Sequence, residues 1–174
     1  FTEGKNIRIN NKLTIETRKE SAEGLIWKMP AGFVPTNFDY TSGMLSTGKS
    51  FWQNDGIFEI KAKFNPEKEV VSSAMLQGEN ISPRVMLLEM GTKSRLGVAN
   101  STKDGKQNVE GLDIANLNKN KWYIFTLVKQ GGTLTWKINE TEVLKLENQN
   151  INFKLHLSFL SLVVYDIPGS KLPV

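Results

Sequence analysis

Alternation between apolar and polar residues is the feature of this chain that most limits its fold. Residues 56–63 (GIFEIKAK) place Phe58, Ile60 and Ala62 on one side and charged side chains on the other. A period of two residues is the pattern of a half-buried β-strand, whereas amphipathic helices repeat every 3.6 residues. Helical spacing is almost absent from the sequence. The pattern therefore predicts an all-β fold.

Glycine and asparagine mark the expected turns between these strands. Two alternating runs, residues 122–129 (WYIFTLVK) and 133–138 (TLTWKI), flank Gln130-Gly131-Gly132. Glycine accepts the positive φ of a tight turn, so the two runs predict a β-hairpin. Asn139-Glu140 predicts a further turn, which leads into a strand at residues 141–146. Turns at such short intervals favour a β-sandwich or a β-barrel.

Two longer segments complete this reading of the chain. Residues 153–165 are mostly apolar and predict a central strand with the segment that follows it. Residues 101–120 are polar and are expected to form a loop. Neither a linker nor a repeat divides the 174 residues, which suffice for one sizeable core. We therefore expect a single domain over residues 1–174.

Composition excludes several classes of protein and site. The chain has no cysteine, which excludes disulfides and thiolate metal sites. Its net charge of +4 comes from scattered lysines and arginines, which argues against a nucleic-acid partner. No apolar run reaches the roughly 18 residues that span a bilayer. The sequence begins at Phe1 rather than at Met, so we expect a trimmed product, and any signal peptide or lipid anchor would lie outside these residues.

Residues 40–63 (YTSGMLSTGKSFWQNDGIFEIKAK) resemble a strand pair of glycoside hydrolase family 16. Residues 121–143 (KWYIFTLVKQGGTLTWKINETEV) resemble that family's late hairpin, and residues 154–162 (KLHLSFLSL) resemble its final cleft strand. The resemblance implies a jelly-roll β-sandwich of two antiparallel sheets, the concanavalin A-like fold of enzymes that cut β-glucans and galactans. It also implies an extracytoplasmic place, on the surface or in the periplasm of a bacterium, or secreted. The family's outermost strands look short at both ends.

The family's catalytic signature, E-x-D-x-x-E or the same set without one residue, falls on residues 84–89 (RVMLLE). In a retaining glycosidase, two carboxyl groups about 5–5.5 Å apart act as nucleophile and acid. Here the acid position holds Glu89, whereas Arg84 and Met86 occupy the nucleophile and helper positions. The spacing without a bulge places Val85 and Leu87 there instead. In either register the nucleophile is missing, and a guanidinium cannot form the glycosyl ester.

Glu89 therefore has two interpretations. It pairs with Arg84 or another base in a partly buried strand, or it contacts a sugar directly, and the two are compatible. The resemblance places further residues at the cleft, with Met75 where a sugar-binding tryptophan usually stands. The expected ligand-binding set is Arg84, Met86, Glu89, Met75, Trp52, His156 and Ser158.

Single aromatic and sulfur-containing residues each have an alternative structural role. His156 either lines the cleft or makes a hydrogen bond at an edge or in the core. Trp122 and Trp136 are expected in the core, and Trp27 and Trp52 either at a cleft rim, stacking on sugars, or folded over the core. The methionines at the expected sugar-contacting positions either make the cleft floor apolar or simply fill space: Met44, Met75 and Met86.

The favoured function is binding of a poly- or oligosaccharide in a former active-site cleft, with neither a cofactor nor a metal. One alternative is an active endo-acting hydrolase in which Glu79 or Glu59 works with Glu89 as the acid. It requires two carboxyl groups within about 10 Å. The other alternative is an assembly module with a filled cleft and an exposed apolar patch elsewhere.

Overall fold

The structure is a computed structural model of the 174-residue chain. It describes residues 1–64, 69–80, 82–91, 94–101, 104, 106–115, 117–118 and 120–163. The regular elements of this part are all β-strands, paired antiparallel. None of the described residues belongs to a helix that is long and apolar enough to cross a membrane. The predicted all-β class is confirmed.

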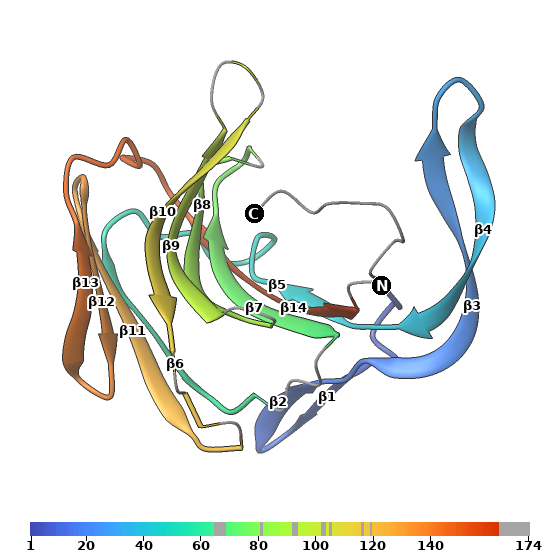
Figure 1. The fold of residues 1–174 in the computed structure, drawn as a ribbon, viewed down its shortest axis with the longest axis horizontal. Helices are drawn as coiled ribbons and strands as arrows, with labels where there is room; N and C mark the ends of the chain where they lie inside the picture. Colours follow the sequence, from blue (N-terminus) through green and yellow to red (C-terminus); the bar gives the residue numbers. More distant parts are fainter. Residues whose placement is uncertain are drawn as a thin grey trace.

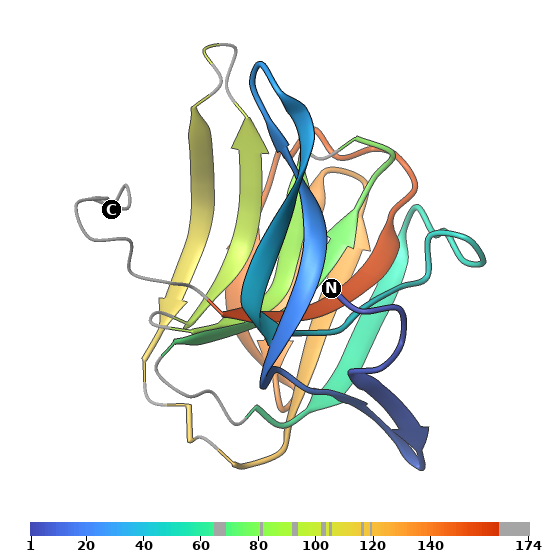
Figure 2. The ribbon, with the colours of Figure 1, turned by 90° about the vertical axis from the view of Figure 1, so that its right-hand side faces the viewer.

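Two curved sheets lie face to face (Figures 1 and 2). The larger sheet has the spatial order β10 (Gln107–Ile114), β9 (Ser94–Ser101), β8 (Arg84–Met90), β7 (Val70–Gln77), β14 (His156–Val163) and β5 (Met44–Ser46). The smaller sheet has the order β13 (Thr141–Leu146), β12 (Thr133–Ile138), β11 (Tyr123–Gln130) and β6 (Gly56–Ala62). This arrangement is the predicted jelly-roll sandwich. The face of the larger sheet that points away from the smaller one is called the concave face below.

The core fills the space between the two sheets because one side of each alternating strand is apolar. Phe58 of β6 and Leu127 of β11 lie opposite each other and are fully buried. Trp136 of β12 is buried beside them, and its Nε1–H donates a 2.9 Å hydrogen bond to the carbonyl of Met86 on β8. This bond connects the core of the smaller sheet to the strand on which the catalytic signature falls.

The two predicted hairpin turns are confirmed. Strands β11 and β12 pair up to Gln130 and Thr133, and Gly131 between them has a φ of 57°. Asn139 and Glu140, which join β12 to β13, have φ values of 47° and 69°. Positive φ at both central residues is the conformation of the tight turns that match the twist of paired strands.

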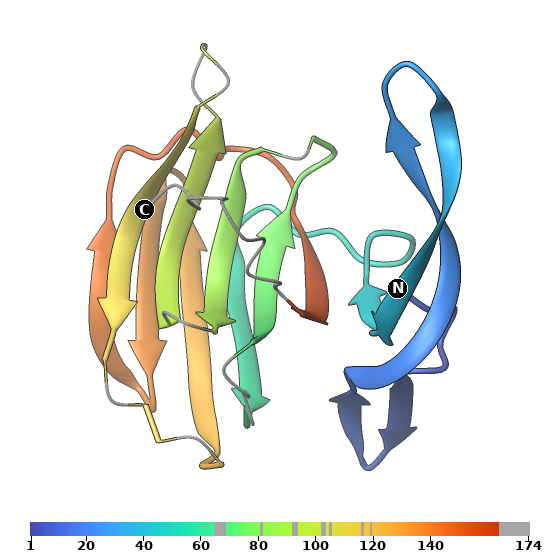
Figure 3. The same ribbon diagram turned by 45° about the vertical axis from the view of Figure 1, so that its right-hand side comes forward.

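Two further hairpins lie beside the sandwich (Figure 3). The short one pairs β1 (Ile7–Asn10) with β2 (Lys12–Ile15), and the long one pairs β3 (Arg18–Lys28) with β4 (Gly32–Thr41). The long hairpin rises opposite the concave face (Figure 1). Its exposed apolar side chains include Leu25, Trp27, Met29 and Phe33. Trp27 therefore lies in a strand and is exposed, rather than folded over the core.

Two sequence-based expectations are wrong. Residues 101–120 are not a loop throughout, because Gln107–Ile114 forms β10 and pairs with β9 over its full length. Edge strands with a solvated face are mostly polar, which makes them resemble loops in a sequence. Trp122 is not in the core, since it is 43% exposed. Trp122 directly precedes β11. The first residue of that strand, Tyr123, packs against the core, so the adjacent Trp122 does not.

A buried lysine joins the smaller sheet to the loop before β6. Lys129 of β11 is fully buried, and its Nζ lies 3.0 Å from both Asn54 Oδ1 and Asp55 Oδ1. The same Asp55 oxygen accepts a 3.1 Å hydrogen bond from the N–H of Gly131. The hydrogen bond from Lys129, with smaller help from its charge and from the Gly131 N–H, lowers the pKa of Asp55 below its ordinary 3.8.

This lowered pKa predicts a loss of stability in acid. A carboxylate with a depressed pKa in the folded state contributes stability above its unfolded pKa and loses it as the pH falls through the folded one. The denaturation midpoints of the wild type and Asp55→Asn should therefore differ near neutrality and converge below about pH 4. Urea titrations over this range measure the difference, and Asp104→Asn, at an exposed position, is the control. A difference that stays constant down to about pH 2.5 would contradict the assignment.

Candidate functional site

A β-bulge in β8 decides which residues of the catalytic signature share a face. Ala74 of β7 lies opposite Leu88, whereas its neighbour Met75 lies opposite Met86, so Leu87 is the extra residue of β8. The bulge resets the alternation. Consequently the side chains of Arg84, Met86 and Glu89 all lie on the concave face. Of the two registers considered for residues 84–89, the one with a bulge therefore applies.

Methionine and serine side chains form the middle of the concave floor. Ser46, Ser158, Met75 and Met86 lie opposite one another on neighbouring strands from β5 to β8. Met75, Met86 and Ser158 are buried, yet they do not belong to the core between the sheets. The Oγ of Ser158 has no hydrogen-bond partner among the described residues. The floor at this level therefore consists of two methionines and two serines.

A row of three charged residues crosses one end of this floor. Glu89 of β8 lies opposite Arg95 of β9, and Arg95 lies opposite Asp113 of β10. The Nε of Arg95 is 3.6 Å from Glu89 Oε1 and 4.0 Å from Asp113 Oδ1. The base that pairs with Glu89 is thus Arg95. Arg84 instead donates a 3.5 Å hydrogen bond to Gln107 Oε1, at the other end of the floor.

The three side chains of this row are partly exposed. Both Glu89 and Arg95 are 31% exposed, and Asp113 is 66% exposed. The Arg95 Nε itself is buried and has no hydrogen-bond partner among the described residues, since both carboxylates are beyond hydrogen-bond distance of it. Because Arg95 carries five N–H donors and each carboxylate has several acceptor sites, hydroxyl groups of a ligand find both kinds of partner here.

A hollow of about 430 Å³ lies at the opposite end of the floor, beside β5 and β14. Its wall includes His156, whose ring lies 4.5 Å from that of Trp52 in an edge-to-face contact. Trp52 Nε1–H donates to the carbonyl of Gly48 at 2.7 Å, and Ser46 Oγ lies 3.1 Å from His156 Nδ1. Lys49 and Glu79 add one charge of each sign. The structure thus brings Trp52 and His156 together, in a contact that the sequence did not indicate.

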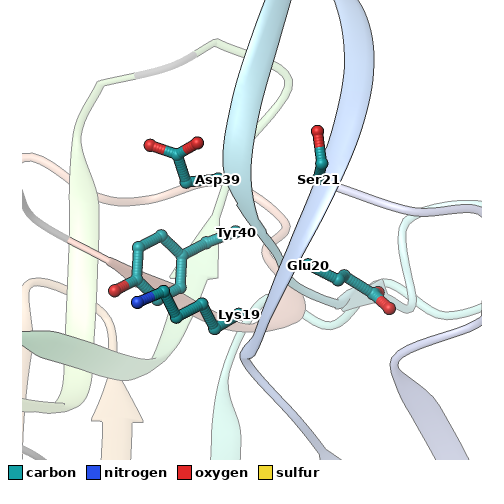
Figure 4. Close-up of a pocket in the computed structure, with 5 residues that line it drawn as sticks. All are labelled: Lys19, Glu20, Ser21, Asp39 and Tyr40. Carbon is teal, nitrogen blue, oxygen red and sulfur yellow. The ribbon is translucent and has the colours of Figure 1, made fainter.

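A second hollow, of about 360 Å³, lies at the base of the long hairpin (Figure 4). Its lining residues are Lys19, Glu20, Ser21, Asp39 and Tyr40. The register of β3 shifts between Lys19 and Ala22, where Glu20 and Ser21 are the unpaired residues. In Figure 4, Lys19 and Tyr40 extend to one side of the hairpin and Glu20 to the other. This hollow could not be predicted from the sequence, because a bulge in a polar strand interrupts no visible pattern of apolar residues.

The carboxylates suggested as partners for Glu89 do not reach it. Glu59 lies on β6 in the other sheet, where its Oε2 accepts a 2.8 Å hydrogen bond from Thr126. Glu79 follows β7 at the end near His156, whereas Ser73 at the other end lies opposite Glu89. Ser73 and Gln77 alone are about 13 Å apart along the strand. Neither Glu59 nor Glu79 thus forms the required pair.

Arg95 and Asp113 are the site residues that the sequence analysis missed. Asp113 was hidden in the segment interpreted as a loop, and Arg95 was not considered. The alternation of residues 107–114 is too weak to place Asp113 on a face of its strand. Arg95 could have been found, because it follows Glu89 by six residues and a short hairpin brings residues at that spacing opposite each other. Among the described residues, no group of three or more histidine, aspartate or glutamate side chains is arranged to hold a metal ion.

Comparisons with known proteins support the fold. The kappa-carrageenase from Pseudoalteromonas carrageenovora, solved with an oligotetrasaccharide of kappa-carrageenan, is 16% identical with a TM-score of 0.73, covering 92% of this chain and 70% of that one. The laminarinase catalytic domain from Thermotoga maritima is 18% identical with a TM-score of 0.73 and coverages of 93% and 70%. The endo-β-1,3-glucanase from Pyrococcus furiosus is 18% identical with a TM-score of 0.68 and coverages of 93% and 68%.

At such identities the likeness shows the fold alone. It is the jelly-roll of family 16 glycanases, as the resemblance predicted. No protein-family profile matches the sequence, and no curated protein matches it.

Proposed function

We propose that this protein binds a carbohydrate of the β-glucan or galactan type on its concave face and does not cleave it by a retaining mechanism. One observation carries the proposal: the bulge in β8 turns Arg84, Met86 and Glu89 to that face. These are the positions at which the E-x-D-x-x-E pattern has its three carboxylates. The structural relatives are glycanases, and the kappa-carrageenase among them forms a complex with an oligosaccharide.

The chemistry of these three positions supports binding over retaining hydrolysis. A retaining enzyme needs a carboxylate that attacks the sugar and an acid that holds a proton. Arg84 has no nucleophilic oxygen. The one carboxylate left at these positions, Glu89, is already paired with a cation, since Arg95 Nε lies 3.6 Å from Glu89 Oε1.

The two ends of the floor are suited to different parts of a sugar chain. The half-buried Trp52 offers apolar surface to the C–H faces of pyranose rings. The charged row offers donors and acceptors to hydroxyl groups. A chain lying across the strands contacts both. Such a protein suits the cell surface or periplasm of a bacterium that degrades polysaccharides, in keeping with the absence of cysteine.

A second candidate is an inverting hydrolase, because Glu89 and Asp113 lie near each other. Both are within 4.0 Å of the Arg95 Nε, so their nearest oxygens are at most about 8 Å apart, an upper bound that is compatible with the roughly 6.5–9.5 Å of inverting carboxyl pairs. In that scheme Glu89 is the acid and Asp113 the base. The Arg95 guanidinium lies between these two carboxylates, 3.6 Å from Glu89 and 4.0 Å from Asp113.

One experiment separates binding, hydrolysis and the assembly role. Native gels cast with β-glucans, galactans, agarose-type polymers or xylans are run with the protein and then stained for polymer. We expect retardation in at least one polymer without a cleared zone. A cleared zone would favour the hydrolase. A protein that migrates freely in every gel and self-associates in sedimentation would point to the exposed hairpin residues and the assembly role.

The hollow beside β5 gives a prediction within this assay. Trp52→Ala removes the ring that packs on His156 and should weaken retardation about tenfold, as loss of an aromatic contact residue commonly does. Trp122→Ala is the matched control, since it removes the same exposed side chain beside β11 of the smaller sheet. Equal losses in the two variants would argue against binding at this hollow.

A further inference from the structure

Charged side chains of both signs line the concave face. The cations Arg84, Arg95 and Lys49 lie on the floor or in its hollow beside β5, and so do the carboxylates Glu79, Glu89 and Asp113. The hairpin hollow is lined by Lys19 together with Glu20 and Asp39. A surface that attracts a polyanion usually gathers cations, whereas these cations lie among carboxylates.

Arg95 lies where an anionic group of a ligand would meet two carboxylates. A guanidinium is the group that best matches sulfate or carboxylate geometry. On this floor, however, Arg95 already lies between two carboxylates, Glu89 at 3.6 Å and Asp113 at 4.0 Å. An anionic substituent that approaches Arg95 meets both of them, and like charges at such distances repel. An uncharged hydroxyl, by contrast, both accepts from the guanidinium and donates to a carboxylate.

We infer that Glu89 and Asp113, by flanking Arg95, make this cleft select glycans whose units carry neither sulfate nor carboxylate groups. Asp113 is the specificity-determining residue in this scheme, because it is the more exposed of the two carboxylates and the first that an incoming substituent meets. The inference rests on the proposed carbohydrate-binding function and narrows it to neutral polymers.

The test uses polymers with one backbone in two charge states. Affinity gels at low ionic strength are cast with laminarin or its chemically sulfated derivative, and with a neutral or a sulfated galactan. The wild type should be retarded more by the neutral member of the pair. Asp113→Asn should bind the sulfated polymer about two- to fivefold more tightly, a range typical of one exposed charge, and high salt should remove the gain.

Glu142→Gln is the matched control, because it changes the net charge by the same amount on the exposed surface of β13 in the other sheet. A gain in Asp113→Asn alone supports the inference. Equal gains in the two variants would show a net-charge effect and overturn the role of Asp113. Tighter wild-type binding to the sulfated polymer would overturn the inference while leaving carbohydrate binding intact. Retardation in no gel would instead remove the proposed function on which the inference rests.

Discussion

Replacing Trp136 by alanine should lower the free energy of unfolding by about 3–5 kcal/mol, the usual cost of deleting a large buried aromatic side chain. Trp136 is 1% exposed and packs among core residues of both sheets. Its loss leaves a cavity and also removes the donor to the Met86 carbonyl. For a domain of this length the melting temperature should fall by roughly 10 °C or more, measured by thermal unfolding monitored by circular dichroism.

Two variants show whether burial and the hydrogen bond account for this effect. Trp122→Ala makes the same chemical change at an exposed position and should cost no more than about 1 kcal/mol. Trp136→Phe keeps most of the ring and loses the N–H donor, so it should cost about 1–3 kcal/mol because the buried carbonyl of Met86 loses its partner. If Trp122→Ala were as destabilising as Trp136→Ala, the core described between the sheets would be wrong.

The largest expected effect on binding follows from removing Arg95. Arg95→Ala should weaken retardation by the preferred polymer at least tenfold, because the change deletes the cleft's donor at this end. It also leaves Glu89 and Asp113 with no cation between them, so their carboxylates repel each other. Affinity gels measure the loss, and an unchanged melting temperature shows that the fold survives.

Arg95→Lys is the informative control for this prediction. Lysine keeps the charge between the two carboxylates but not the planar set of five donors, so part of the loss should remain. Full binding in Arg95→Lys would mean that Arg95 acts only through its charge, which offsets the repulsion between the two carboxylates. Full binding in Arg95→Ala would contradict a sugar-contacting role for this row altogether.

Local patterns were enough to predict most of the sandwich. The alternation in residues 56–63 placed Phe58 and Ile60 in the core, where the structure has them. The Gly131-Gly132 turn and the Asn139-Glu140 turn were both placed correctly. Such features are readable because turn conformation and side-chain direction depend on a few neighbouring residues.

Elements that the sequence did not indicate have a different property. The polar β10, which was interpreted as a loop, and the long β3–β4 hairpin bury little apolar surface, so their alternation is faint. Trp122 looked like part of the strand it precedes, but the strand begins one residue later. Without an apolar face, the start and end of a strand depend on which neighbour it pairs with, and the neighbour is distant in the chain.

The candidate site divides in the same way. The sequence alone was enough to predict antiparallel sheets. It also showed that residues 84–89 lack two of the three acids in the signature. Which of the two registers applied, and which base met Glu89, depended on the bulge at Leu87 and on pairing with β9 and β10. A strand's alternation is local, but the partner across the sheet is chosen by the register of other strands. Only the tertiary structure therefore placed Arg95 between Glu89 and Asp113.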